Sequence, residues 1–309
     1  MKQKTILVTG KLPPPVGGVT VFISYLYQAF DRSKKVKLLN LSLSNLLFKS
    51  YDAFLINASN SKKRLLFIIL GRLLFKKTFF IKHGGLLNLS SISVRLSLFL
   101  SHGVICLNED VKKQLTVIGV RTKLITTVFA ENISAFDIEK EKPMKLTRGD
   151  EKCKVLFYIN NDSVINGEEV YGAKFLISCL HMLENDFLFT VIDLSKKYED
   201  GFSVFSNVVY YQEPQNFSMC LKENHIYIRP TSTDGMSVAL LEAGVMGVRC
   251  LASDAVQRPS FVFTYKYKSR ADFITQLNKL AFSNDIALPS RVELNSASDL
   301  ESFIFPHTD

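Results

Sequence analysis

Short apolar runs alternate with stretches of helical periodicity along most of this chain, and no other feature of the sequence constrains its fold as strongly. In the first half, strand-like runs occupy residues 5–8, 53–57, 78–82, 103–107 and 123–128. Between them, apolar residues recur at helical spacing over residues 19–30, 62–75, 94–101 and 109–119. Strands that alternate with helices in this way predict an α/β fold in which a parallel sheet carries helices on both faces.

The alternation restarts after a polar segment near the middle of the chain. Residues 141–152 are mostly charged or polar and include Pro143 and Gly149, which is typical of a linker. Beyond them, strands are expected at residues 154–159, 188–193, 207–211, 226–229 and 250–253, and helices at residues 172–183, 236–245 and 270–282. The length of 309 residues is enough for two domains. We therefore predict one parallel-sheet domain at residues 1–140, a linker at 141–152 and a second such domain at 153–309.

The two halves differ in charge. Residues 1–150 hold 24 Lys and Arg against 9 Asp and Glu, whereas residues 151–309 hold 14 against 20. The basic half is expected to approach an anionic partner, either a phospholipid surface or a nucleic-acid backbone. Nucleic acid is not expected, because the sequence holds no stacking-aromatic motif or known binding module. Residues 62–77, with basic ends around an apolar middle, are either a core-facing helix or a surface that rests on anionic lipid.

The sequence also indicates where the protein works. Its most apolar stretch, residues 65–75, is interrupted by Gly71 and Arg72 and is shorter than the roughly 18 residues that cross a bilayer. Five Cys residues without a C-x-x-C pair indicate buried thiols in a reducing compartment. We therefore expect no membrane-spanning helix and no signal peptide, and a cytoplasmic protein peripheral to the inner face of the plasma membrane.

The densest pattern of polar residues lies at 227–259. A strand is expected to end at Arg229, because Pro230 cannot continue a central ladder. A loop and a helix capped by Asp234 or Ser237 follow, and the free N–H groups of that helix form an anion site at the carboxyl end of a parallel strand. Eight residues separate Asp234 from Glu242, roughly 12 Å along a helix. That is too far apart for an acid/base pair but suits two ends of an extended ligand.

This segment resembles the donor-binding signature of glycosyltransferase family 4, retaining enzymes of the GT-B fold. The family motif is an acidic residue, seven further residues and a Glu, here Asp234 and Glu242. Its flanks, Arg229-Pro-Thr before and Arg258-Pro after, are similar to those of sugar transferases from bacterial surface-polysaccharide gene clusters. Other landmarks of the resemblance are Gly17-Gly18 after the first strand, His83-Gly-Gly at a strand end, and Tyr171-Gly where the family has Lys-Gly.

The resemblance implies two Rossmann-like domains that face each other across a cleft, the first on the acceptor side and the second binding the nucleotide sugar. It implies an enzyme that transfers a hexose-type sugar from a UDP- or GDP-sugar, with retention, to a lipid-linked oligosaccharide. The substrates would be a nucleotide sugar and this acceptor, on an anionic membrane surface. No cofactor or metal is expected, and the sequence holds no D-x-D triplet.

The resemblance also implies roles for individual residues. Glu242 would hold the ribose hydroxyls, and His83 would lie near the transferred sugar or the acceptor hydroxyl. Backbone at Gly17 and Gly18 would approach the diphosphate closely. The donor sugar and its phosphate would be held by Asp234 and by the N–H groups of Gly235, Met236 and Ser237.

One departure from the family affects activity. The family carries an Arg and a Lys on the loop that follows the first strand of the second domain, but residues 158–172 contain neither. The nearest substitutes are Lys174, Arg229 and Arg258. The missing cations leave open a sugar-nucleotide-binding partner subunit with weak or absent turnover. A non-hydrolysing sugar-nucleotide epimerase also stays open, because it shares the same architecture.

Overall fold

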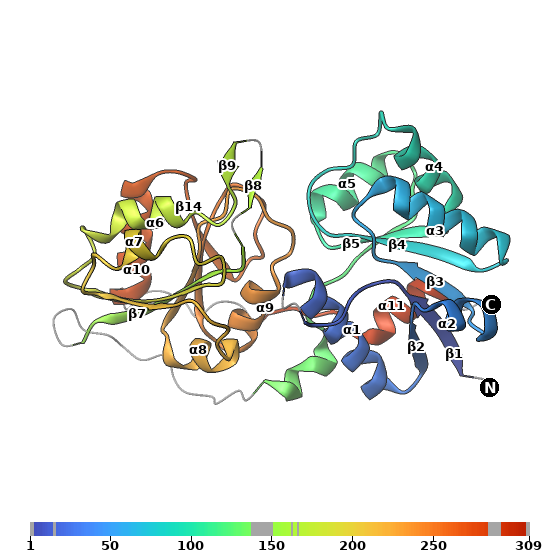
Figure 1. The fold of residues 1–309 in the computed structure, drawn as a ribbon, viewed down its shortest axis with the longest axis horizontal. Coiled ribbons are helices and arrows are strands. Elements are labelled where there is room, and N and C mark those ends of the chain that lie inside the picture. Colours follow the sequence, from blue (N-terminus) through green and yellow to red (C-terminus); the bar gives the residue numbers. More distant parts are fainter. Residues whose placement is uncertain are drawn as a thin grey trace. The chain divides into compact units, whose positions relative to one another are not determined.

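The computed structural model describes residues 3–14, 17–136, 151–161, 163–165, 167–283 and 292–306. The chain divides into two compact units (Figure 1). The first comprises Met1–Ala135, Gly235–Val238 and Glu293–Asp309, and the second comprises Phe136–Asp234 and Ala239–Val292. Each is built around a parallel sheet with helices on both faces, which confirms the predicted α/β class.

Among the described residues, the sheet of the first unit has six parallel strands in the order β2-β1-β3-β4-β5-β6. They are β1 (Lys4–Val8), β2 (Val36–Asn40), β3 (Ala53–Ile56), β4 (Lys77–Lys82), β5 (Gly103–Cys106) and β6 (Thr122–Leu124). The central strands β3 to β5 consist almost wholly of buried residues, as a parallel sheet covered on both faces requires.

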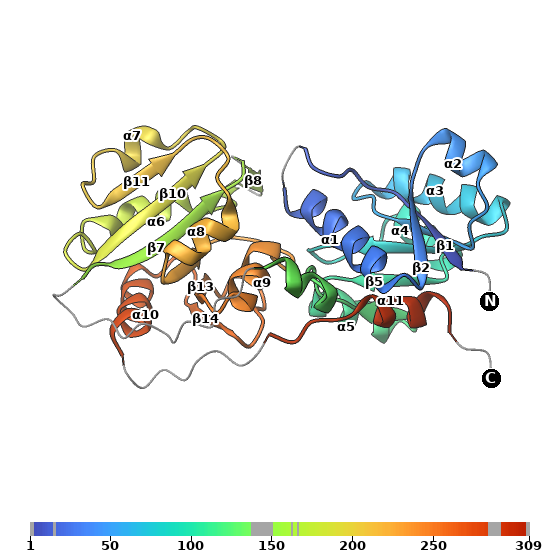
Figure 2. The same cartoon turned by 90° about the horizontal axis from the view of Figure 1, so that it is seen from below.

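The chain reverses its direction across this sheet at β1. Crossovers between parallel strands are right-handed. The helix between β1 and β2 therefore lies on one face of the sheet, and the helices that connect the later strands lie on the opposite face. The first of these faces carries α1 (Gly18–Ser33), which packs through Phe22, Ile23 and Leu26. The opposite face carries α2 (Leu43–Phe48), α3 (Ser61–Leu73), α4 (Ile92–Leu100) and α5 (Glu109–Val117), as Figures 1 and 2 show. A short 3-10 helix, η1 (Ala130–Ala135), ends the segment.

The described sheet of the second unit has the order β11-β10-β7-β12-β13-β14, with all neighbours parallel. Its strands are β7 (Cys153–Ile159), β10 (Phe187–Asp193), β11 (Val208–Tyr211), β12 (Ile226–Arg229), β13 (Arg249–Ser253) and β14 (Val262–Tyr265). This is the strand order of a doubly wound dinucleotide-binding fold, in which the chain starts at a central strand and reverses its direction once.

Helices α6 (Ala173–Leu180), α7 (Glu199–Phe202), α8 (Phe217–Glu223), α9 (Val238–Val245) and α10 (Arg270–Phe282) complete the second unit, with a small hairpin of β8 (Val164–Ile165) and β9 (Glu168–Glu169). The core between sheet and helices is rich in aromatic residues, among them Phe157, Phe189 and Phe273. All five cysteines are buried and free.

The C-terminal helix α11 (Ala297–Ile304) belongs to the first unit. The Phe303 ring lies 5.6 Å from that of Phe79, and the Arg121 guanidinium lies over Phe303. The predicted second domain extended to residue 309, so its observed boundary differs. α11 buries its apolar face on the sheet of the first unit, whose strands lie more than 150 residues earlier in the sequence. Most of the predicted linker, residues 141–150, lies outside the described residues.

Candidate functional site

The candidate site of the second unit lies where β7 and β12 run side by side. From β7 the chain crosses to one side of the sheet, and β12 begins the crossing to the other side. The carboxyl ends of such a pair form the ligand-binding crevice of an open α/β sheet. Tyr158 stands near the end of β7, and Tyr227 and Arg229 stand on β12.

Arg229 and Asp234 form a forked ion pair in this crevice. The Nε of Arg229 donates to Oδ2 of Asp234 at 2.5 Å, and its Nη2 donates to Oδ1 at 3.2 Å. The side chains are only 12% and 11% exposed. The loop after β12 turns back at Pro230, so Asp234, five residues after Arg229, lies against the end of the strand that carries Arg229.

Arg258 binds the same carboxylate from the loop after β13. Its Nη1 donates to Oδ2 of Asp234 at 3.1 Å. Its Nε donates to the carbonyl oxygen of Ser253 at 2.9 Å, and its Nη2 donates to Thr231 Oγ1 at 2.8 Å. The side chain is 2% exposed. Arg258 thus ties together the loops that follow β12 and β13.

The electrostatics of the cluster favour an ionised Asp234. Burial alone would raise the pKa of this carboxyl, but the guanidinium groups of Arg229 and Arg258 hold it below its usual value. Burial likewise opposes the charged form of Arg229, yet Asp234 raises its pKa well above the ordinary range. An anionic ligand that binds Arg229 would therefore compete with Asp234 for the guanidinium or share it.

A set of tyrosines adjoins the ion pairs. The Tyr158 hydroxyl donates to Asn160 Oδ1 at 3.2 Å, and the Arg229 guanidinium lies 5.7 Å from the Tyr171 ring centre. Burial, and then the neighbouring Tyr227, Tyr171 and Glu242, raise the pKa of Tyr158. We had not predicted Tyr158 and Tyr227 as site residues, although their position near the ends of two central strands was a usable signal.

Glu242 lies on α9 and is 8% exposed. Its charge is one of the causes that raise the pKa of Tyr158, near the end of β7. Asp234 is not on the same helix, because α9 begins only at Val238 and the expected helix began at residue 236. The predicted phosphate-binding residues Gly235, Met236 and Ser237 form the segment that leads into α9.

The loop at residues 158–172, which contains neither Arg nor Lys, is anchored to the next helix by one of its glutamates. The Glu169 carboxylate accepts from the backbone N–H groups of Ala173 at 2.7 Å and of Lys174 at 3.2 Å, which caps α6. Gly172 is required here, because its φ is +77° and a Cβ would lie 2.2 Å from the Pro230 carbonyl oxygen. The Lys174 side chain is exposed and makes no ion pair with the residues that the structure describes.

His83, Gly17 and Gly18 lie in the first unit. The Nε2 of His83 is 2.7 Å from Oδ1 of Asn57. Burial and the Lys82 ammonium lower the pKa of His83 from 6.5 to about 4, so the ring is neutral at pH 7. An amide oxygen only accepts, so Nε2–H donates and Nδ1 carries the lone pair. Gly17 is the N-cap of α1, and a Cβ on Gly18 would meet nothing within 4 Å.

The structure therefore brings Arg229, Asp234 and Arg258 into direct contact, and Glu242 lies buried on α9, the helix that follows them in the chain. It does not bring Lys174 into that cluster. Arg229 and Arg258 are predicted to bind a diphosphate, and in the structure both contact Asp234. The convergence of Arg258 on an acid 24 residues earlier is a tertiary contact that no sequence spacing indicates.

Comparison with solved structures identifies the fold. The lipopolysaccharide outer core galactosyltransferase WaaB, in its apo form, matches with a TM-score of 0.67 and 13% identity over 97% of this chain and 99% of that one. The catalytic domain of starch synthase IV from Arabidopsis thaliana, bound to ADP and acarbose, matches with a TM-score of 0.68 and 10% identity over 98% and 99%. Anabaena Alr3699/HepE in complex with UDP matches with a TM-score of 0.63 and 14% identity over 97% and 94%.

These proteins define the class: the chain has the GT-B fold that glycosyltransferases such as WaaB use. No family model matches the sequence, and no curated protein matches it. At 10–14% identity the likeness extends to the fold alone, and one fold supports several reactions. The reaction has to be argued from the site.

Proposed function

We propose that the chain is a glycosyltransferase that moves a sugar, with retention, from a nucleoside-diphosphate donor to a saccharide acceptor. The observation that carries the proposal is the position of Glu242 and of the Arg229–Asp234–Arg258 cluster in the second unit. The ion-pair cluster lies at the carboxyl ends of β12 and β13, where open α/β sheets bind nucleotides, and Glu242 lies on α9, the next helix after β12. The donor is a UDP- or GDP-sugar, and HepE, of the same fold, binds UDP.

In this proposal the buried Glu242 accepts hydrogen bonds from the ribose hydroxyls. The diphosphate takes the place of Asp234 on Arg229, and the released carboxylate accepts from hydroxyls of the donor sugar. The N–H groups of Gly235, Met236 and Ser237 add donors for the phosphate. Departure of the diphosphate from the front face requires stabilisation of its charge and no protein nucleophile.

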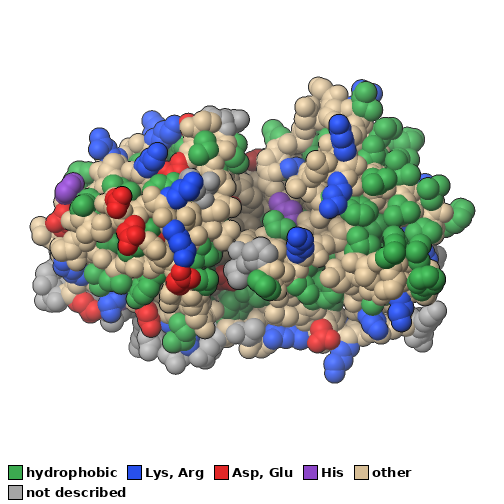
Figure 3. Space-filling model, viewed as in Figure 1, with side chains coloured by type: hydrophobic (Ala, Val, Ile, Leu, Met, Phe, Trp, Pro, Cys, Tyr) green, Lys and Arg blue, Asp and Glu red, His purple; other side chains and the backbone are tan. Residues whose placement is uncertain are grey.

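The acceptor is lipid-linked, and an apolar patch on the first unit supports this part of the proposal. Among the described residues, no helix is long and apolar enough to cross a membrane. Figure 3 shows apolar side chains gathered on the face that carries α2, α3 and α4. The members of this apolar patch are exposed: Leu43, Leu47, Phe48, Leu66, Leu73, Phe75, Ile92 and Phe99.

Basic residues accompany the patch. Lys62 and Lys63 begin α3, Arg72 and Lys77 lie near its end, and Arg95 lies on α4, all of them exposed. Apolar side chains among lysines and arginines fit the interface of an anionic bilayer, where each basic residue adds about 1 kcal/mol of attraction. This arrangement favours the lipid-surface interpretation of residues 62–77, at the inner face of the plasma membrane.

A second candidate is a partner subunit that binds the nucleotide sugar without turning it over. The observation in its favour is that Asp234 occupies both arginines, while the loop at residues 158–172 contributes only acids near α6. If Asp234 does not yield Arg229 to the diphosphate, the leaving group lacks a cation.

Incubation of the pure protein with UDP- and GDP-sugars, with and without a lipid-linked acceptor extract, tests the proposal. Nucleotide release that depends on the acceptor supports the transferase. Binding without release in either condition favours the partner subunit, and conversion of the donor sugar without acceptor identifies an epimerase. Absence of binding to every nucleotide sugar would contradict the donor site itself.

A further inference from the structure

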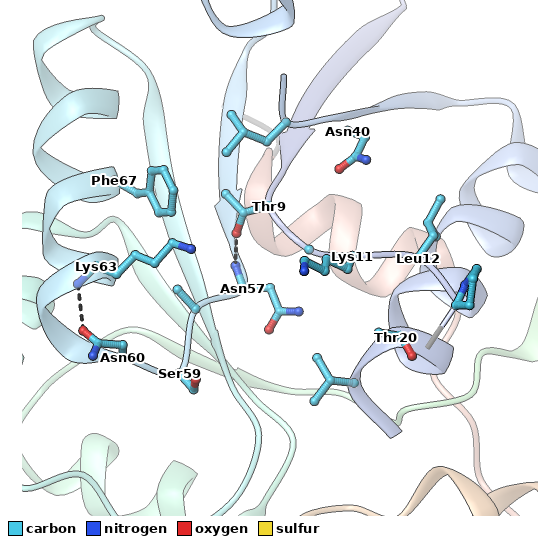
Figure 4. Close-up of a pocket in the computed structure, with 15 residues that line it drawn as sticks. Thr9, Lys11, Leu12, Thr20, Asn40, Asn57, Ser59, Asn60, Lys63 and Phe67 are labelled. Carbon is cyan, nitrogen blue, oxygen red and sulfur yellow. Dashed lines mark hydrogen bonds between the residues drawn. The ribbon is translucent and has the colours of Figure 1, made fainter. Parts of the chain in front are cut away.

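A cavity of about 850 Å³ opens in the first unit (Figure 4). It lies at the carboxyl ends of three neighbouring strands: Thr9 follows β1, Asn40 ends β2 and Asn57 follows β3. The chain reverses its direction across the sheet at β1, so this is the switch point of the first sheet. Open α/β sheets bind their ligands at that place.

The polar groups of the cavity are held in place. The backbone N–H of Asn57 donates to Thr9 Oγ1 at 2.7 Å, and the Asn57 side-chain oxygen accepts from His83 at 2.7 Å. The Asn57 amide nitrogen is thereby directed as a donor. Figure 4 shows Phe67 and Lys63 on one side of the cavity and Thr20 on the other. Amides, hydroxyls and one aromatic ring are the groups that hold a sugar ring.

The charge of the cavity is one-sided. Lys11 and Lys63 line it, and none of the lining residues that the structure describes is an acid. Both lysines are exposed, and neither makes an ion pair within the described part of the chain. The N-terminal turn of α1, which contributes Val19 and Thr20 to the lining, also contains no acid. The positive end of the α1 helix dipole adds to the positive potential.

The first unit also holds a buried cation, Arg64, which does not itself line the cavity. Arg64 follows Lys63 on α3, is 2% exposed, and has an Nε without a hydrogen-bond partner among the described residues. Its guanidinium lies 4.7 Å from the Phe80 ring centre, and no described carboxylate pairs with it. Burial, and then Arg64, lower the pKa of the neighbouring Lys82. Cations that share a region without a counter-ion favour a bound anion.

We propose that this cavity binds an anionic saccharide, a sugar ring that carries a phosphate or a carboxylate, with the anion on Lys11 and Lys63 and the ring against Phe67 and Asn57. The inference rests on the proposed function, for which it names the chemical class of the acceptor. Asn57 lines the cavity and is hydrogen-bonded to His83. A sugar that contacts the Asn57 amide would therefore be connected to the neutral imidazole through this one residue.

Ligand-observed NMR titrations of the full chain with glucose 6-phosphate, glucuronate, glucose and inorganic phosphate test the proposal. At least one acidic sugar should bind about tenfold more tightly than glucose, since its anion forms charge-assisted hydrogen bonds to the lysines. A higher affinity for glucose 6-phosphate would identify the anion as a phosphate, and a higher affinity for glucuronate would identify it as a carboxylate. Equal affinity for glucose and both acidic sugars overturns the proposal, and so does inorganic phosphate that binds as tightly as glucose 6-phosphate.

Variants locate the binding. Lys63→Gln and Lys11→Gln should each weaken the acidic sugar about tenfold and leave glucose unchanged. Lys62→Gln is the matched control, because Lys62 is an equally exposed neighbour on α3 that does not line the cavity. Equal losses in Lys62→Gln and Lys63→Gln would show nonspecific charge attraction and refute the site.

A separate titration with UDP and GDP distinguishes this inference from the proposed function. Nucleotide binding that persists while acidic sugars fail to bind refutes the saccharide cavity alone. Absence of nucleotide binding, with acidic sugars still bound at Lys11 and Lys63, contradicts the donor site and leaves the cavity supported.

Discussion

The Asp234 carboxylate accepts hydrogen bonds from Nε and Nη2 of Arg229, at 2.5 and 3.2 Å. Only 12% of the Arg229 side chain and 11% of the Asp234 side chain are exposed. Arg258 reaches the same carboxylate from a different loop. Asp234 is therefore the counter-ion of two buried arginines as well as the first acid of the predicted donor motif. A substitution at this position has to affect stability before it can report on catalysis.

We expect Asp234→Asn to destabilise the second unit. The substitution leaves two buried guanidinium groups without a counter-ion, a change that costs about 3–5 kcal/mol for buried pairs. Chemical denaturation followed by circular dichroism measures the free energy of unfolding. Asp254→Asn is the control, because it removes an exposed carboxylate of the same unit and keeps the acceptor for the Tyr267 N–H. Equal stability of the two variants would contradict the ion-pair cluster.

The pH dependence of this contribution has a definite sign. The arginines hold the pKa of Asp234 below its ordinary value of 3.8. The carboxylate therefore stabilises the fold at neutral pH, and that stability is lost as the pH falls below the value of the unfolded chain. Asp234→Asn should remove this part of the acid sensitivity.

Glu242→Ala should weaken nucleotide affinity by about 1–3 kcal/mol, the cost of lost hydrogen bonds to ribose hydroxyls. Isothermal titration calorimetry with UDP and GDP measures the effect. Glu223→Ala provides the comparison, since Glu223 is an exposed acid on α8 in the same unit. Unchanged nucleotide affinity in a folded Glu242→Ala protein would count against the donor site.

His83 gives a second pH-dependent prediction, in the first unit. Burial and Lys82 lower its pKa to about 4, whereas the unfolded chain takes up the proton near 6.5. The unfolded state thus binds more protons between these values, and stability should fall as the pH drops from about 6.5 to 4. His83→Gln keeps a donor for Asn57 and should flatten this decline. His181→Gln, at a side chain 80% exposed, should not.

The sequence was most informative where strands are buried on both faces. The runs that form β3, β4, β5 and β12 were predicted to within about a residue, because a covered parallel strand is apolar throughout. The edge strands β2 and β14 were missed. In Val36–Asn40 a lysine interrupts the apolar pattern, and Val262–Tyr265 is short and half-exposed.

The site was predictable in part for the same kind of reason. Arg229, Asp234 and Glu242 could be found because they lie in one continuous segment around a strand end. The pairing of Arg258 with Asp234 could not, since it depends on how two loops pack. Lys11 follows β1, whereas Asn57 and Lys63 follow β3, and only the pairing of these two strands in the sheet brings the three residues to one cavity.

Phe75 provides a prediction in which stability and function change in opposite directions. It ends α3 in the left-handed region, with φ at 55°, and its ring is 97% exposed. The N–H groups of Phe75 and Lys76 bond to the carbonyl oxygens of Arg72 and Gly71, the helix-ending motif that glycine normally completes. A phenylalanine costs stability there, and its ring is almost fully exposed among the residues that the structure describes, which fits a residue that inserts into lipid.

Phe75→Gly should therefore raise the free energy of unfolding by about 0.5–1 kcal/mol, because glycine adopts the left-handed conformation without strain. The same variant should bind vesicles of anionic phospholipid about tenfold more weakly, since it loses a buried aromatic ring in the interface. Co-sedimentation with phosphatidylglycerol vesicles measures the binding, with Val204→Ser in the second unit as the control for an exposed apolar side chain outside the apolar patch. If the stabilised variant binds vesicles as tightly as the parent protein, Phe75 takes no part in membrane association, and the inner-membrane location loses its support at α3.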